Sequence, residues 1–165
     1  MKAALLVVDI QNDFFNISQA CTDSLKSAIQ YVNAAIALFR KKNLPVIAVQ
    51  HKSVEDNLVP GKMGFDIPDS VKLEPSDLRI VKTHGNSFND TGLTEKLRSL
   101  GVDTVIITGF CAEQCVLSTY KGAEDLDFKP IILKGSIASD NPEHARFVEE
   151  ITDTVTFGAL RTLLQ

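Results

Sequence analysis

The residue best suited to take part in a chemical reaction is Cys115, in the stretch GFCAEQCV that covers residues 109–116. An apolar strand is predicted to end at Gly109, and a helix is predicted to begin near Cys115. Unpaired backbone N–H groups and the helix dipole lower the pKa of a thiol at such a position. The same N–H groups can stabilise the oxyanion of an acyl-transfer intermediate. The pattern indicates a nucleophile, with a buried, unreactive thiol as the alternative.

Two charged residues directly follow apolar stretches elsewhere in the chain. Asp9 follows AALLVV, and Lys82 follows RIV. Ligands of open α/β sheets bind at the carboxyl ends of the strands, where both residues are predicted to lie. Separately, Asp9 could cap a nearby loop and Lys82 could reach solvent. Together with Cys115 they supply a base, a cation and a nucleophile for attack on a carbonyl carbon.

The remaining cysteines and the histidines form no recognisable metal site. Cys111 precedes the candidate nucleophile in a C-x-x-x-C pattern, which is not the usual redox spacing and lacks the partners of a zinc site. We expect Cys111 to be a buried thiol and Cys21 to be incidental. His51 is expected to line the site, whereas His84 and His144 are expected in a loop and on a helix surface. We therefore predict no metal and no cofactor.

Apolar runs alternate with segments of helical periodicity along the chain. Six strands are predicted, at residues 3–8, 44–51, 78–82, 103–109, 129–135 and 153–157. Helices are predicted at residues 22–39 (with Thr22 as N-cap), 92–101, 116–126, 140–151 and 158–165. The alternation predicts a single α/β domain over residues 1–165, with a mostly parallel six-stranded sheet and helices on both faces, in a Rossmann-like three-layer arrangement.

One segment interrupts this alternation. Residues 52–77 contain Pro60, Gly61, Gly64, Pro68 and Pro75 and show no helical or strand period. A connection of this length in a compact domain is usually functional. We expect it to act as a lid or as an oligomer contact, with disorder as the alternative.

Composition restricts the classes of partner. The formal net charge of −4 and the pI near 5.3 argue against a nucleic-acid or anionic-membrane surface, which needs a basic patch. The apolar run at the N-terminus is too short for a signal peptide or a membrane span. Three cysteines give no complete disulfide framework, which favours reduced thiols and a cytoplasmic location.

These residues and their order resemble the isochorismatase-like cysteine hydrolases, the family that includes nicotinamidases and N-carbamoylsarcosine amidases. The similarity covers nearly the whole chain. It begins with ALLVVDIQNDFF, continues through VKTHGNSFNDTGLTEKLRSLGVDTVIITGFCAEQCVLSTYKGAEDLDF and weakens towards EHARFVEEI and TVTF.

The resemblance implies a role for each key residue. Asp9 is expected to be the general base and acid, Lys82 the lysine of the catalytic triad and Cys115 the nucleophile. The family has a non-proline cis peptide, which is expected at Phe110–Cys111. The backbone N–H groups of Cys111 and Cys115 are then expected to form the oxyanion hole.

Departures from the family pattern concern the substrate. Nicotinamidases hold a metal with an Asp and several histidines after the second strand, whereas the corresponding segment here has one histidine, His51. The resemblance therefore supports neither a metal nor nicotinamide. Isochorismatase itself lacks the nucleophilic cysteine, so Cys115 favours C–N hydrolysis. Ala112 stands where a small polar residue is usual, and LKGSIAS replaces the commoner Asp-Ala pair after the fifth strand.

The sequence thus predicts a hydrolase that cleaves a C–N bond of a small amide or ureido compound through a thioester. Phe14, His51 and Phe88 are expected to contact this small-molecule substrate. A homo-oligomer, either dimer or tetramer, is expected because oligomers are common in the resembled family. A non-catalytic oligomeric or regulatory protein and a thiol redox or sensor protein using Cys115 with Cys111 stay open as alternatives.

Overall fold

Six parallel strands form one sheet in the computed structural model, which describes residues 1–165. Every pairing between neighbouring strands is parallel, and the spatial order is β3-β2-β1-β4-β5-β6. This arrangement confirms the predicted fold class and places β1 inside the sheet, with β2 and β4 as neighbours. The strands are β1 (Ala3–Val8), β2 (Val46–His51), β3 (Leu78–Lys82), β4 (Thr104–Phe110), β5 (Lys129–Ala138) and β6 (Thr154–Val155).

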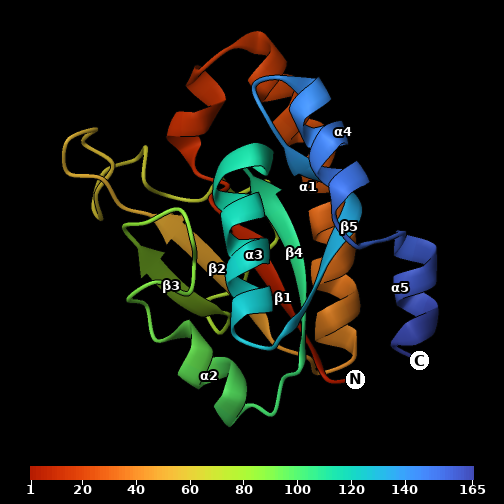
Figure 1. The fold of residues 1–165 in the computed structure, drawn as a ribbon. Coiled ribbons are helices and arrows are strands. Elements are labelled where there is room, and N and C mark those ends of the chain that lie inside the picture. Colours follow the sequence, from red (N-terminus) through yellow and green to blue (C-terminus); the bar gives the residue numbers. More distant parts are fainter.

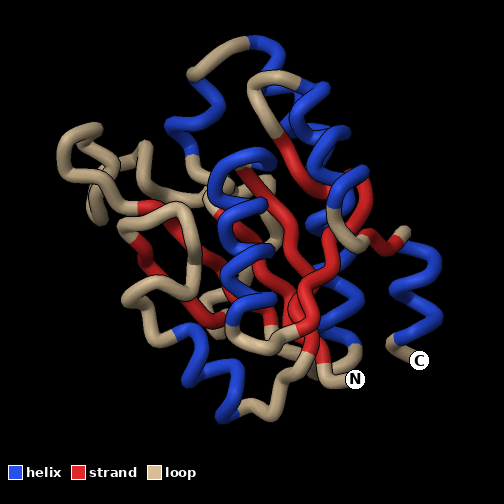
Figure 2. The backbone as a smooth tube through the Cα atoms, in the orientation of Figure 1, coloured by secondary structure: helices blue, strands red, loops and turns tan.

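Helices cover both faces of the sheet (Figures 1 and 2). Helices α1 and α5 contribute to the apolar core on one face, and α2, α3 and α4 contribute to the core on the other. The molecule therefore has the three layers that the sequence predicts. None of its helices is both long and apolar enough to cross a membrane. The helices are α1 (Gln19–Lys41), α2 (Leu93–Ser99), α3 (Leu117–Asp125), α4 (Pro142–Ile151) and α5 (Phe157–Leu163).

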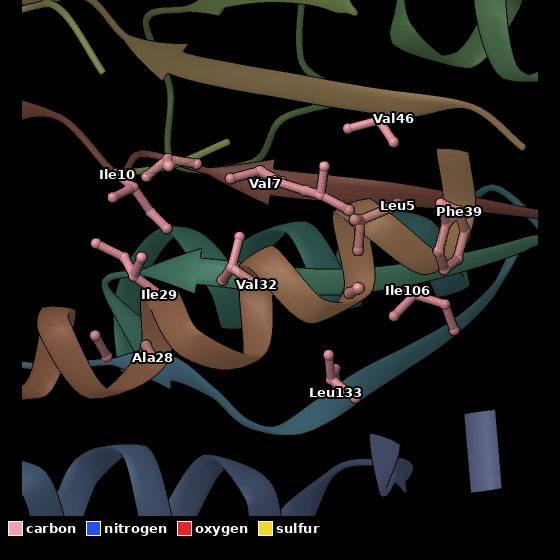
Figure 3. Close-up of a cluster of buried hydrophobic side chains, with 14 of the residues drawn as sticks. Leu5, Val7, Ile10, Ala28, Ile29, Val32, Phe39, Val46, Ile106 and Leu133 are labelled. Carbon is pink, nitrogen blue, oxygen red and sulfur yellow. The ribbon is translucent and has the colours of Figure 1, made fainter. Parts of the chain in front are cut away.

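Strand β1 is buried on both faces. Leu5 and Val7 pack in the core shared with α1, as Figure 3 shows, whereas Leu6 and Val8 pack in the core of the opposite face. All four side chains are fully buried. Burial on both sides explains why this strand is a continuous apolar run rather than an alternating one.

Helix α1 begins earlier than the sequence predicts. Its N-cap is Ser18, whose backbone is extended and whose hydroxyl accepts a hydrogen bond from the Cys21 N–H at 3.0 Å. Thr22 lies inside the first turn, where its hydroxyl donates to the carbonyl oxygens of Phe15 and Ser18. The prediction of Thr22 as the cap is therefore wrong, and Cys21 is a buried residue of the helix.

The connection from Lys52 to Asp77 contains no helix and no strand of the main sheet. Its only ladder contact is an isolated bridge between Ser53 and Leu58. Three of its apolar side chains are nevertheless buried, namely those of Leu58, Phe65 and Val71. The segment is therefore packed onto the domain. Figure 1 shows its first part on the side towards which β2 and β3 point, and its last part returns to the start of β3.

The approach of β4 to β1 depends on Gly109. This residue has φ of 116°, and a Cβ atom built on it would lie 2.0 Å from the carbonyl oxygen of Val8. The Gly109→Ala substitution is therefore expected to lower the free energy of unfolding by about 3 kcal/mol or more, because backbone atoms must move apart.

Chemical denaturation followed by circular dichroism measures this loss. Gly158→Ala is the control, because its Cβ would meet no atom within 4 Å. This control lies in α5, where alanine is the better helix former, so its stability should be equal or slightly higher. Equal stability of the two variants would contradict the proposed close approach.

Candidate active site

The ends of three strands bring the predicted triad together. Asp9 directly follows β1, Lys82 is the last residue of β3, and Cys115 lies in the turn after β4. The ammonium nitrogen of Lys82 is 2.8 Å from Asp9 Oδ2 and 3.3 Å from Cys115 Sγ. Asp9 and Lys82 are each only 1% exposed, so the charged pair is removed from solvent.

The ammonium group of Lys82 has two further neighbours. It donates a hydrogen bond to the carbonyl oxygen of His84 at 3.0 Å and lies 3.0 Å from His51 Nδ1. An ammonium group has donors and no acceptor, so Nδ1 must be the accepting, unprotonated nitrogen of the His51 ring. Burial and the Lys82 charge lower the pKa of His51, which keeps the ring neutral with its proton on Nε2.

Asp9 is positioned as a base. Burial raises its pKa above the ordinary value for a carboxyl group, although the neighbouring Lys82 ammonium opposes this rise. Oδ2 is bonded to Lys82, whereas Oδ1 is buried without a hydrogen-bond partner. The backbone of Asp9 has φ of 50°, in the left-handed region that is uncommon for residues other than glycine. Such strained conformations cluster at functional sites.

Cys115 is a protonated thiol in the resting site. Burial, together with the Asp9 carboxylate, raises its pKa to about 11, and Lys82 opposes this rise. The lowered pKa expected from the start of a helix is therefore wrong for this state. The carboxylate favours the protonated thiol because its negative charge disfavours a second negative charge on the nearby sulfur. A thiol with this pKa can act as a nucleophile near neutral pH only if a base removes its proton.

The turn after β4 carries a cis peptide between Phe110 and Cys111, as the resemblance implied. A π-helical turn from Ala112 to Val116 then leads into α3, so helical structure begins about four residues earlier than predicted. The Cys111 carbonyl oxygen accepts hydrogen bonds from the N–H groups of Gln114 and Val116. This turn places the Cys115 thiol beside Asp9 and Lys82. Single π-helical turns occur frequently at functional sites.

Glu113 anchors this turn to Ser139, directly after β5, and to His144 in α4. Its Oε1 atom accepts hydrogen bonds from Ser139 Oγ at 3.0 Å and from His144 Nδ1 at 2.8 Å. Burial alone would raise the pKa of Glu113, but these bonds hold it below the ordinary value, so the carboxylate is ionised. The sequence placed His144 on a helix surface and did not indicate this contact. Burial and the nearby carboxylate raise the pKa of Cys111 to about 12.

Gln11 joins the strand ends on the other side of the site. This residue is fully buried, and its side-chain oxygen accepts from the His51 N–H at 2.7 Å. Its side-chain nitrogen donates to the carbonyl oxygens of His51 and Phe65, each at 3.0 Å. These bonds fix the end of β2 and the loop that follows it. The sequence motif contained Gln11 but gave it no role, although a glutamine three residues after the end of a buried strand was the available signal.

A cavity of about 290 Å³ opens over the triad. Asp9, His51 and Cys115 line it, together with the apolar side chains of Phe14 and Phe110, whose ring centroids are 4.9 Å apart. The expected contacts of Phe14 and His51 are thus consistent with this cavity.

Phe88 is not among the residues that line this cavity. Its ring stacks on Phe128 at 5.7 Å, in the core beneath α2 and α3. An apolar side chain of this size is buried more favourably in that core than at a solvent-open site.

Asp9, His51 and Cys115 also offer three ligand atoms within 4.8 Å of one another, a set that can suit a transition metal. However, Lys82 Nζ contacts all three groups. A cation therefore already compensates this set of acceptors, and a metal ion bound to the three groups would have to displace the ammonium. This geometry fits an ammonium site better than a metal site.

Comparison with known proteins identifies the family. The model of the isochorismatase domain matches residues 3–156. The uncharacterised isochorismatase family protein YddQ of Bacillus subtilis is 34% identical over 127 residues, which cover 74% of this chain and 70% of that protein. A ureidoacrylate amidohydrolase, RutB, of Pseudomonas savastanoi is 24% identical, over 88% of this chain and 74% of that protein.

A solved structure supports the same fold. The isochorismatase-like hydrolase of Alkaliphilus metalliredigens superposes with a TM-score of 0.88 at 23% identity, with full coverage of both chains. The family model spans all the residues of the site described above, from Asp9 to His144. The chain therefore belongs to the isochorismatase family.

Proposed function

We propose that this protein is a cysteine-dependent amidohydrolase that cleaves a C–N bond of a small amide or ureido compound. The observation that carries the proposal is the contact of one buried ammonium group, that of Lys82, with both the Asp9 carboxylate and the Cys115 sulfur. The similarity to a ureidoacrylate amidohydrolase supports the same class of bond.

In the first step, Cys115 Sγ attacks the carbonyl carbon while its proton passes to Asp9 Oδ1. This oxygen is suited to the transfer because it is buried and has no other partner. Its raised pKa makes Asp9 a stronger base than an ordinary carboxylate. The backbone N–H groups of Cys111 and Cys115 stabilise the oxyanion. The C–N bond then breaks, Asp9 returns its proton to the leaving nitrogen, and a thioester remains.

In the second step, water attacks the thioester carbonyl and gives a proton to Asp9. The C–S bond breaks, and Asp9 returns the proton to the sulfur, which restores the thiol. Lys82 has the same function in both steps. Its ammonium stabilises negative charge on Asp9 before each proton transfer and on the sulfur during it.

The alternatives have less support. All three cysteines are free, and the raised pKa of Cys111 leaves little thiolate for exchange with Cys115, which argues against a redox pair. A non-catalytic role would leave the buried ion pair of Asp9 and Lys82 beside the Cys115 thiol without an explanation. The homo-oligomer and the cytoplasmic location stay predictions, which light scattering and cell fractionation can test.

Cys115→Ala is expected to abolish turnover and to leave the fold intact. The substitution removes the nucleophile, and its loss costs at least about 1,000-fold in kcat. Ammonia release from a panel of small primary amides and ureido compounds measures it. Cys21→Ala is the control, because this thiol lies outside the cavity, and its turnover should stay within about twofold. An active Cys115→Ala enzyme would exclude the thioester mechanism.

Asp9→Asn is expected to separate thiol reactivity from turnover. Without the carboxylate, Lys82 stabilises the Cys115 thiolate directly, so its pKa should fall and alkylation by iodoacetamide at pH 7 should become about tenfold faster. Hydrolysis should nevertheless be lost with the base. Peptide mass spectrometry assigns the modified cysteine. Slower alkylation in the variant would show that Asp9 does not raise the pKa of the Cys115 thiol.

The pH profile should report the ionisation of Asp9. Activity requires the carboxylate, so kcat/KM should fall as the pH drops through a pKa that lies above the ordinary value for an aspartate. Lys82→Met removes the charge that opposes this rise, so its acid limb should move to higher pH and its kcat should fall. Circular dichroism at each pH checks that the variant stays folded. An unchanged acid limb would contradict the assignment.

A further inference from the structure

Two carboxylates that the mechanism does not use line the active-site cavity. They belong to Asp13, in the 3₁₀ helix Asn12–Asn16, and to Asp56, in the loop after β2. Neither forms an ion pair with any lysine, arginine or histidine of the chain, and no lysine or arginine lines the cavity. Both are exposed, so they can meet a charged group that enters from solvent.

The other ionisable groups of the cavity carry no net charge. Asp9 is compensated by Lys82, as the ion pair at 2.8 Å shows. His51 is neutral because burial and Lys82 lower its pKa, and Cys115 is protonated because burial and Asp9 raise its pKa to about 11. Among the residues that line the cavity, the uncompensated charges are therefore those of Asp13 and Asp56, and both are negative.

The cavity has the other features of a ligand site. The buried Asp9 Oδ1 lines it without a hydrogen-bond partner, which leaves an acceptor for a bound molecule. Phe14, Leu58 and Phe110 form apolar walls, and the volume of about 290 Å³ is at the small end for ligand pockets. Such walls suit a short aliphatic spacer, and aromatic faces also attract cations.

Both carboxylates are held in place by local structure. The Asp13 N–H donates to the carbonyl oxygen of Gly64 at 3.1 Å, and the Asp13 carboxylate packs against Gly64 itself. A Cβ atom on Gly64 would lie 2.3 Å from Asp13 Oδ1, so in this conformation the carboxylate occupies space that the glycine leaves free. The Asp56 carboxylate accepts a hydrogen bond from the Ser53 hydroxyl at 2.5 Å, and the backbone N–H of Asp56 donates to Ser53 Oγ at 3.3 Å.

We propose that the substrate is a small amide or ureido compound that carries a protonated amine or a guanidinium group at its far end. Its carbonyl lies at Cys115, its aliphatic spacer lies along Phe14 and Phe110, and its cation is held by Asp13 and Asp56. This inference rests on the proposed amidohydrolase function and adds the charge of the substrate to it.

Three amides of equal length test the proposal: 5-aminopentanamide, hexanamide and 5-carbamoylpentanoate, which end in an ammonium, a methyl and a carboxylate group. For the wild-type enzyme we expect kcat/KM to be about tenfold higher for the ammonium compound than for hexanamide, and lowest for the carboxylate compound. The preference should weaken as the salt concentration rises, because the two carboxylates are exposed.

Substitutions assign the preference to residues. Asp56→Asn and Asp13→Asn should each reduce kcat/KM for 5-aminopentanamide and change that for hexanamide by less than about twofold. Ser53→Ala should act in the same direction, because it releases the Asp56 carboxylate. Asp69→Asn is the matched control: it removes the same charge from the same loop, at an exposed residue outside this cavity. Its charge preference should equal that of the wild type.

Binding separates this inference from the proposed function. Calorimetry with the Cys115→Ala variant measures the affinity for the three amides without turnover. Tighter binding of 5-aminopentanamide that Asp56→Asn abolishes would support the cation site even if none of these amides is hydrolysed. Hydrolysis of hexanamide with no preference for the cation in either assay would overturn the inference and leave the amidohydrolase proposal intact. Equal binding of the three amides with no hydrolysis would also overturn it.

Discussion

The buried ion pair between Asp9 and Lys82 is the constraint on which the site depends. Two opposite charges that are each 1% exposed must compensate their lost hydration within the protein. Removing either partner from such a pair typically costs about 3–5 kcal/mol, because the other charge stays buried. The ends of β1 and β3 are therefore held at a fixed separation across β2. His51 and the carbonyl oxygen of His84 complete the set of acceptors around the ammonium.

The surrounding structure places a thiol against this pair without ionising it. Gly109 allows β4 to approach β1, Gln11 fixes the end of β2, and Glu113 ties the turn after β4 to Ser139 and His144. The resulting site contains a protonated thiol beside a carboxylate with a raised pKa. A protonated thiol reacts slowly with oxidants from solvent, and in the proposed mechanism it becomes a nucleophile only when Asp9 takes its proton.

Much of this arrangement could be predicted from local sequence. The continuous apolar runs that end at Asp9 and Lys82 identify buried parallel strands, whose ends must share one edge of the sheet. The sequence alone was a poorer guide to which of several nearby residues takes a particular structural role. Ser18 and Thr22 are both good caps, and only the backbone conformation decides between them. The pairing of Glu113 with His144 spans 31 residues and depends on how α4 packs, which no local pattern encodes. Phe88 is apolar enough for either a pocket or a core.

The residues at the floor of the cavity do not determine which substrate binds. In the proposed mechanism, a compensated Asp9–Lys82 pair and a neutral His51 can act on any carbonyl that reaches Cys115. Discrimination must then come from groups further out, where Asp13 and Asp56 are supported by the 3₁₀ helix and by the loop after β2. This loop packs through buried side chains such as Phe65, while Asp56 stays exposed. Substitutions in its exposed part can therefore change the charge of the cavity entrance without disturbing the buried ion pair on which the proposed mechanism depends.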